Sequence, residues 1–110
     1  MVIYITNKLR KLCNEKKVAV RKLGPEMAKL LHQRLTELRA FNCLADVPYT
    51  PPMRRHELVG DYKGVISVDL KHPYRLLFIP ANDPIPLKDD GGYDLTQISE
   101  IEIIGIEDTH

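Results

Sequence analysis

The 110-residue sequence has no apolar run approaching the ~20 residues that span a bilayer. Its beginning, MVIYITNKLRKL, places apolar residues before the charges, the reverse of a signal peptide. Its cysteines, Cys13 and Cys43, do not have metal-ligand spacing, which favours a reducing compartment over a disulfide scaffold. We therefore expect a cytoplasmic protein that does not bind membranes, with both cysteines filling the core from helices.

Several enzyme motifs are also absent. The glycines do not have the spacing of a phosphate-binding loop. There is no HExxH, no CxxC and no nucleophile elbow. Zinc and acyl-transfer chemistry therefore have no support in the sequence, and we expect neither a metal nor a cofactor.

Length and composition describe one globular domain over residues 1–110, because 44% hydrophobic and 28% charged residues are ordinary proportions. The net charge of +1 conceals a gradient along the chain. Residues 1–40 carry ten Lys and Arg against three Asp and Glu, whereas residues 81–110 carry one against eight. The basic part fits either a polyanion-binding surface or a solvated helix face.

Hydrophobic periodicity predicts an α+β fold with a helical hairpin on one face of a mainly antiparallel sheet of four to five strands. Gly24 and Pro25 separate the two expected helices, because glycine ends a helix and proline starts one. The expected elements are a strand over Met1–Thr6, helices over Lys8–Leu23 and Pro25–Phe41, inner strands over Arg54–Val59, Val65–Leu70 and Tyr74–Ile79, and a central last strand over Leu95–Ile106.

Alternation within two of these strands predicts their register. Matching their apolar faces sets Val68 opposite Leu76 and Asp69 opposite Arg75. The face that carries Ser67, Asp69 and Arg75 would then be free of helices and open to solvent.

The remaining polar residues suit RNA cleavage without a metal. That reaction needs a proton acceptor for the ribose 2′-OH, cations for the phosphate and a proton donor for the leaving oxygen. Histidine suits either transfer, since its pKa is ordinarily near 6.5. The candidates are His56, Arg75, Asp108 and His110 for catalysis, and Arg54, Arg55 and Lys63 for phosphate. Each has an ordinary alternative: an ion pair between Arg75 and Asp69, surface positions for the other arginines, and a frayed terminus for His110.

Two stretches, RRHELVGDYKGVISVDLKHPYRLLF and the closing IGIEDTH, resemble the HigB branch of the RelE/ParE family of bacterial toxins. The resemblance implies a RelE-like fold and the toxin of a type II toxin–antitoxin pair. RelE-type members cleave mRNA in the ribosomal A site without a metal. The implied partners are the ribosome, mRNA and a HigA-like helix-turn-helix antitoxin, through which alone operator DNA would be contacted.

Matched by position, His56 corresponds to the family histidine before a Gly-Asp turn, and Arg75 to the strand arginine that contacts the scissile phosphate. Asp108 and His110 correspond to the catalytic C-terminal pair. The sequence departs from the pattern at Thr109, where the family often has tyrosine, and at Val59, where close relatives carry lysine.

These departures leave an alternative: a ParE-like gyrase inhibitor, or a catalytically weak protein that acts mainly as an antitoxin partner. A regulatory subunit without nucleic-acid contact is a third reading. The nuclease hypothesis makes a geometric prediction, that His56, Arg75 and His110 converge on the helix-free face.

Overall fold

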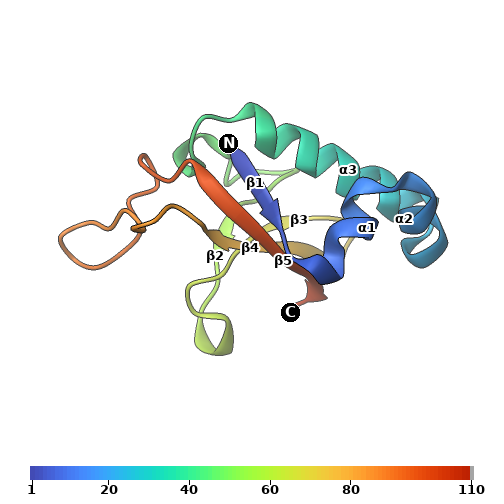
Figure 1. Cartoon of the computed structure of the whole chain (residues 1–110). Coiled ribbons are helices and arrows are strands. Elements are labelled where there is room, and N and C mark those ends of the chain that lie inside the picture. The colour runs from blue at the N-terminus through green and yellow to red at the C-terminus, as the bar shows by residue number, and fades with distance from the viewer. Residues whose placement is uncertain (110) are drawn as a thin grey trace.

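A five-stranded mixed sheet with helices packed on one face forms the structure, a computed structural model that describes residues 1–109 (Figure 1). The strand order is β1-β5-β4-β3-β2, and the β1–β5 pair is parallel whereas the other neighbours are antiparallel. The predicted α+β class is confirmed. The elements are β1 (Val2–Ile5), the 3₁₀ helix η1 (Asn7–Leu9), α1 (Arg10–Asn14), α2 (Lys16–Leu23), α3 (Pro25–Ala40), η2 (Leu44–Asp46), β2 (His56–Glu57), η3 (Gly60–Tyr62), β3 (Ile66–Asp69), β4 (Tyr74–Pro80) and β5 (Glu100–Asp108).

The last strand is central, as predicted, because β1 and β4 pair with its two edges. It starts at Glu100 rather than at Leu95. Asp94 explains why the strand starts later. Its carboxylate accepts a hydrogen bond from the backbone N–H of Thr96 at 3.2 Å, and its carbonyl accepts one from the backbone N–H of Gln97 at 3.0 Å. A turn of this kind takes backbone groups away from a strand ladder.

The prediction of one helix over Lys8–Leu23 is wrong, because Glu15 adopts an extended conformation with φ −118° and ψ 108° and separates α1 from α2. Both Cys13 and Ala19 are buried. Cys13 and Ala19 are six residues apart, which is a rotation of roughly 240° around a continuous helix, so their side chains would lie on different sides of it. The break at Glu15 lets both side chains face the interior. The helical hairpin itself is confirmed, with α3 beginning at Pro25 after a Gly24 of φ 86°.

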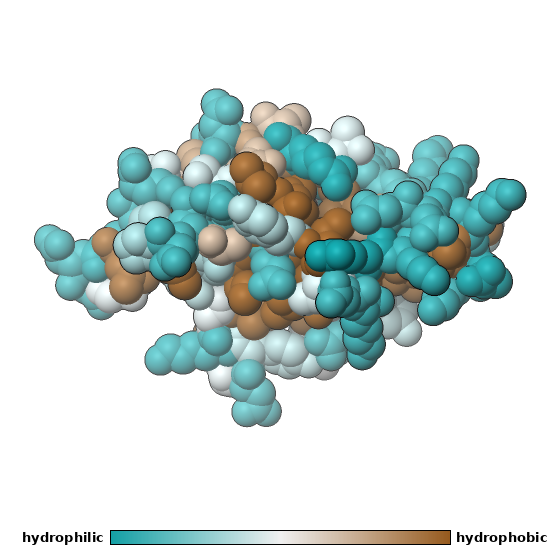
Figure 2. Space-filling view, viewed as in Figure 1, coloured by the Kyte–Doolittle hydropathy of each residue, from teal (hydrophilic) through white to brown (hydrophobic). Residues whose placement is uncertain are grey.

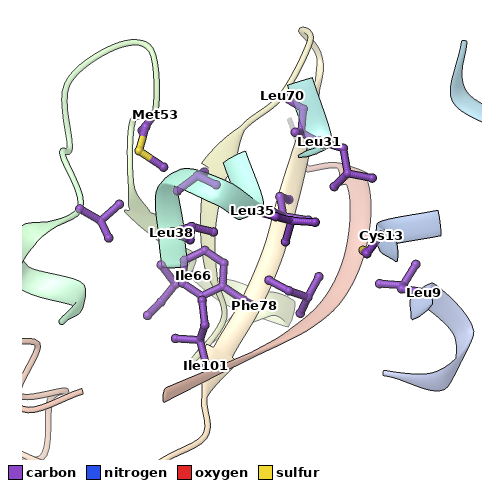
Figure 3. Close-up of a cluster of buried hydrophobic side chains, with 14 of the residues drawn as sticks. Leu9, Cys13, Leu31, Leu35, Leu38, Met53, Ile66, Leu70, Phe78 and Ile101 are labelled. Carbon is purple, nitrogen blue, oxygen red and sulfur yellow. The ribbon is translucent and has the colours of Figure 1, made fainter. Parts of the chain in front are cut away.

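The main core lies between α3 and the sheet (Figure 3). Leucines at three- and four-residue spacing on α3 pack against alternate residues of three strands. Its fully buried members include Leu31, Leu35, Leu38, Ile66, Val68, Leu76, Phe78, Ile101 and Ile103. Cys13 joins this core from α1, and burial raises the pKa of its thiol to about 11. Cys43 does not match its prediction, since it follows α3 outside any helix and is only half-buried.

The β3–β4 register is confirmed, with Val68 opposite Leu76 and Asp69 opposite Arg75. In the described part of the chain, the opposite face of the sheet carries no α-helix, but it is not open, because Ser67 and Leu77 are buried. Side chains from the preceding segment extend across it: Arg54 reaches Asp69, and Tyr62 reaches Glu107 in β5.

The expected inner strand over Arg54–Val59 is a two-residue strand at the edge of the sheet. Arg54 has a positive φ of 47°, which no strand accommodates, and Val59 leads directly into η3. Within residues 1–109, this segment therefore forms strand pairs with β3 only at His56 and Glu57, although the carbonyl of Met53 also accepts a hydrogen bond from the N–H of Asp69.

The surface seen in Figure 1 divides by hydropathy. Hydrophilic side chains cover α1 and α2, and hydrophobic ones form a band over β1 and β5 (Figure 2). Within residues 1–109, no helix has both the length and the apolar character required to cross a membrane.

Candidate active site

Two arginines share one carboxylate on the helix-free face. Asp69 ends β3, and Arg75 lies directly opposite it near the start of β4. Nε of Arg75 is 3.7 Å from Oδ1 of Asp69, and Nη1 of Arg54 is 3.4 Å from Oδ2. The Arg75 side chain is 13% exposed and that of Arg54 is 54% exposed. One guanidinium is therefore fixed within the sheet surface, whereas the other reaches it from solvent.

The C-terminal end of β5 comes alongside this pair of arginines. Nη1 of Arg75 donates a hydrogen bond of 3.2 Å to Oγ1 of Thr109. The β4–β5 register sets Arg75 opposite Glu107 and Tyr74 opposite Asp108. Since side chains alternate along a strand, Asp108 is directed to the other face of the sheet from Arg75. The structure thus brings Thr109 to Arg75 and gives Asp108 the opposite orientation.

His56 lies on the same face as Arg75 but in the neighbouring row. It pairs with Ser67, which pairs in turn with Leu77, whereas Arg75 pairs with Asp69 two residues further along β3. The His56 side chain is exposed at the edge of the sheet. A cavity of about 240 Å³ opens beside it, with Lys88 and Tyr93 among its lining residues. His110 lies outside the described residues, so the convergence of His56, Arg75 and His110 stays a prediction. His56 and Arg75 share a face of the sheet but lie two strands apart.

The three predicted phosphate-binding residues have different surroundings. Arg54 belongs to the Asp69 cluster. Arg55 points inward, where its guanidinium donates to the carbonyl of Leu44, so this residue ties the segment before β2 to η2. Lys63 is exposed just after η3. Arg55 therefore has a structural role, and the accessible cations of the set are Arg54 and Lys63.

Tyr62 and Glu107 extend the cluster and were not assigned a joint role from sequence. The hydroxyl of Tyr62 lies 3.5 Å from Oε1 of Glu107. The negative charge of Glu107 raises the pKa of Tyr62, with smaller contributions from burial and the nearby aspartates. Their contact depends on how η3 is placed beside the end of β5, which no local motif reveals.

Ser67 is the other residue that sequence reasoning did not assign. Its hydroxyl is buried and finds no hydrogen-bond partner within residues 1–109. In the sheet it is paired with His56 of β2 on one side and with Leu77 of β4 on the other, on the face that carries Asp69. The available signal was a small polar residue between two β-branched residues, Ile66 and Val68, in a strand.

The cluster can bind an anion and shield it in part from water, because two guanidiniums meet on a partly covered surface. Its charge is nearly balanced, since Asp69 and Glu107 lie among the arginines. Within residues 1–109, no group of three His, Cys, Asp or Glu side chains is arranged to hold a metal ion.

Comparison with known proteins gives no identification. No protein-family model matches the chain, and no curated protein matches it.

Proposed function

We propose that this protein is the toxin of a type II toxin–antitoxin pair, with a RelE-like fold, and that it cleaves mRNA on the ribosome without a metal. The observation that carries the proposal is the meeting of Arg54 and Arg75 at Asp69, beside the end of β5 and on the face that also carries His56. These residues lie in RRHELVGDYKGVISVDLKHPYRLLF, which, together with the closing IGIEDTH, resembles the toxin family.

In this proposal Arg75, assisted by Arg54, neutralises the phosphate charge that develops during cleavage. His56 and His110 transfer the two protons, one from the 2′-OH and one to the leaving oxygen. Asp108 assists His110, and Lys63 contacts the RNA backbone. Arg55 contributes only by anchoring the segment that carries His56.

The proposed partners are the ribosome, mRNA and a HigA-like helix-turn-helix antitoxin, and the proposed location is the cytoplasm. Operator DNA would be bound by the antitoxin and not by this chain.

A second candidate is a ParE-like gyrase inhibitor, or a catalytically weak protein that acts mainly as an antitoxin partner. It is favoured by the carboxylates of Asp69 and Glu107 next to Arg75, which lower the attraction of the site for phosphate. Thr109 also favours it, because a threonine cannot stack on a base as an aromatic residue does.

Induced expression in a bacterial host distinguishes these functions. We expect growth arrest with mRNA cleavage, detected by primer extension, and relief by Arg75→Ala or by deletion of His110. Arg39→Ala, at an exposed arginine of α3, is the matched control and should stay toxic. DNA damage with intact mRNA would favour gyrase inhibition, and no arrest with tight binding to the adjacent gene's product would favour the inert partner. Full toxicity of both site variants would contradict the nuclease assignment.

A further inference from the structure

Asp69 connects the candidate site to the buried side of the sheet. Nε of Arg34, on α3, donates a 2.9 Å hydrogen bond to the backbone carbonyl of Asp69. The backbone N–H of Asp69 donates to the carbonyl of Met53 at 2.8 Å. Both backbone polar groups of this one residue are thus held by segments outside the β3–β4 pair.

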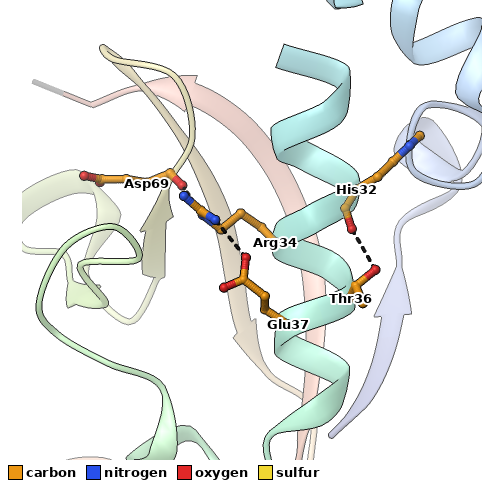
Figure 4. A network of polar contacts seen from close by, with 5 residues as sticks. All are labelled: His32, Arg34, Thr36, Glu37 and Asp69. Carbon is orange, nitrogen blue, oxygen red and sulfur yellow. Dashed lines mark hydrogen bonds and ion pairs between the residues drawn. The ribbon is translucent and has the colours of Figure 1, made fainter. Parts of the chain in front are cut away.

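Arg34 is itself held firmly. Its side chain is 5% exposed, and its Nη1 donates a 2.8 Å hydrogen bond to Oε1 of Glu37, one turn along α3 (Figure 4). A buried guanidinium with two fixed partners has little freedom to move. The carbonyl of Asp69 therefore has a fixed position relative to α3.

The side chain of Asp69 points away from Arg34 (Figure 4). On that opposite side its two carboxylate oxygens are divided between Arg75 and Arg54. Two guanidiniums this close repel each other unless a negative charge lies between them. The carboxylate therefore sets both the spacing of the arginines and the direction in which they point.

We propose that Asp69 is a positioning residue, which holds Arg54 and Arg75 as a matched pair for the scissile phosphate while Arg34 fixes Asp69 from the other face of the sheet. This inference rests on the proposed nuclease function and adds two residues to its site. Asp69 does not touch the reacting atoms: it acts through the arginines, at the expense of some attraction for the phosphate.

Asp69→Asn tests the proposal, because asparagine keeps the shape and removes the charge. With mRNA on purified ribosomes, we expect kcat to fall at least tenfold while KM stays the same or decreases, since the site becomes more positive. Asp69→Glu, which restores the charge on a longer side chain, should recover part of kcat. Asp89→Asn makes the same change of net charge in an exposed loop and should leave both constants unchanged.

Arginine Nε–H signals in ¹⁵N-edited NMR spectra provide a readout that does not need activity. The signals of Arg54 and Arg75 should be dispersed in the wild-type protein and in Asp69→Glu. In Asp69→Asn both should move toward the positions of free arginine, that of Arg75 less far because it still donates to Thr109. If the wild-type protein does not cleave mRNA but these signals move, the function fails and the positioning role stands. Unchanged signals in Asp69→Asn, or equal changes of kcat in Asp69→Asn and Asp89→Asn, would overturn the proposal.

Discussion

Replacing Arg34 by methionine should destabilise the protein through one specific contact. Methionine fills much of the volume of the arginine stem and keeps its apolar packing. It cannot donate a hydrogen bond, so the carbonyl of Asp69 loses the partner that lies 2.9 Å away and Glu37 loses its ion pair. The variant therefore removes polar contacts without opening a large cavity.

The two losses differ in size. A buried acceptor left without its partner costs about 1–3 kcal/mol. Glu37 is 33% exposed, so water hydrates its carboxylate once Arg34 is gone, and this pair adds less than about 1 kcal/mol. We expect the free energy of unfolding to fall by about 1–4 kcal/mol. For a domain of this size that corresponds to a decrease in Tm of about 4–16 °C.

Urea unfolding at pH 7, followed by far-UV circular dichroism, measures this change. Glu37→Gln is the matched control, since glutamine keeps an acceptor for Arg34 and leaves the Asp69 contact in place. We expect it to cost less than about 1 kcal/mol. A loss below about 0.5 kcal/mol for Arg34→Met, with an unchanged m-value, would refute the reasoning, because the Asp69 carbonyl would then not depend on Arg34.

Three further changes probe the fold itself. Burial raises the pKa of Cys13 from 9.0 to about 11, so as the pH rises its thiol ionises in the unfolded chain before it ionises in the folded protein. The free energy of unfolding, measured with urea, should therefore fall by up to roughly 2–3 kcal/mol between about pH 9 and 11. Cys13→Ala should reduce that loss. Gly24→Ala should cost about 1–3 kcal/mol in thermal unfolding, since φ 86° and ψ 160° suit only glycine, whereas Gly105→Ala, in β5 with no positive φ, should be tolerated. Phe78→Ala should cost about 3–5 kcal/mol in urea unfolding, because Phe78 is fully buried at the centre of the core.

The β3–β4 register was predictable because β3 alternates cleanly between apolar and polar residues and because Arg75, near the start of β4, can face Asp69. A shift of one residue would have turned Val68 away from the core and Asp69 toward it. The α3 helix was predictable for a similar reason, as its leucines repeat at helical spacing. Strong periodicity next to a clear turn signal was sufficient in both cases.

The break at Glu15 was not predictable from local sequence, because glutamate is a good helix former. Only the tertiary requirement to bury both Cys13 and Ala19 selects the extended conformation there. The short length of β2 was not predictable either. The positive φ of Arg54 prevents the strand from starting there, and no glycine or asparagine gave a signal for it.

The candidate site was predictable in one contact and not in the others. The register alone brings Asp69 to Arg75. The role of Arg34 was hidden, since an Arg–Glu pair at i and i+3 on a helix ordinarily lies on the surface. Arg55 was equally ambiguous beside Arg54, as neighbouring arginines in a loop give no sign of which one turns inward.

The surplus positive charge of the protein lies on different elements from the arginines of the candidate site. Residues 8–22 carry seven lysines and arginines and one glutamate. At the site, Arg54 and Arg75 are balanced by Asp69 and Glu107.

These regions meet at a groove of about 530 Å³ whose lining includes Lys8, Lys22 and Glu107. A polyanion is therefore attracted chiefly to the helices, through contacts that salt weakens. In the proposed nuclease, the site, which offers little net charge, would select the phosphate by the geometry of its arginines. For the proposed nuclease this means that a nearly neutral protein need not bind RNA weakly, because the charge that attracts the RNA and the arginines that orient it belong to different elements of the fold.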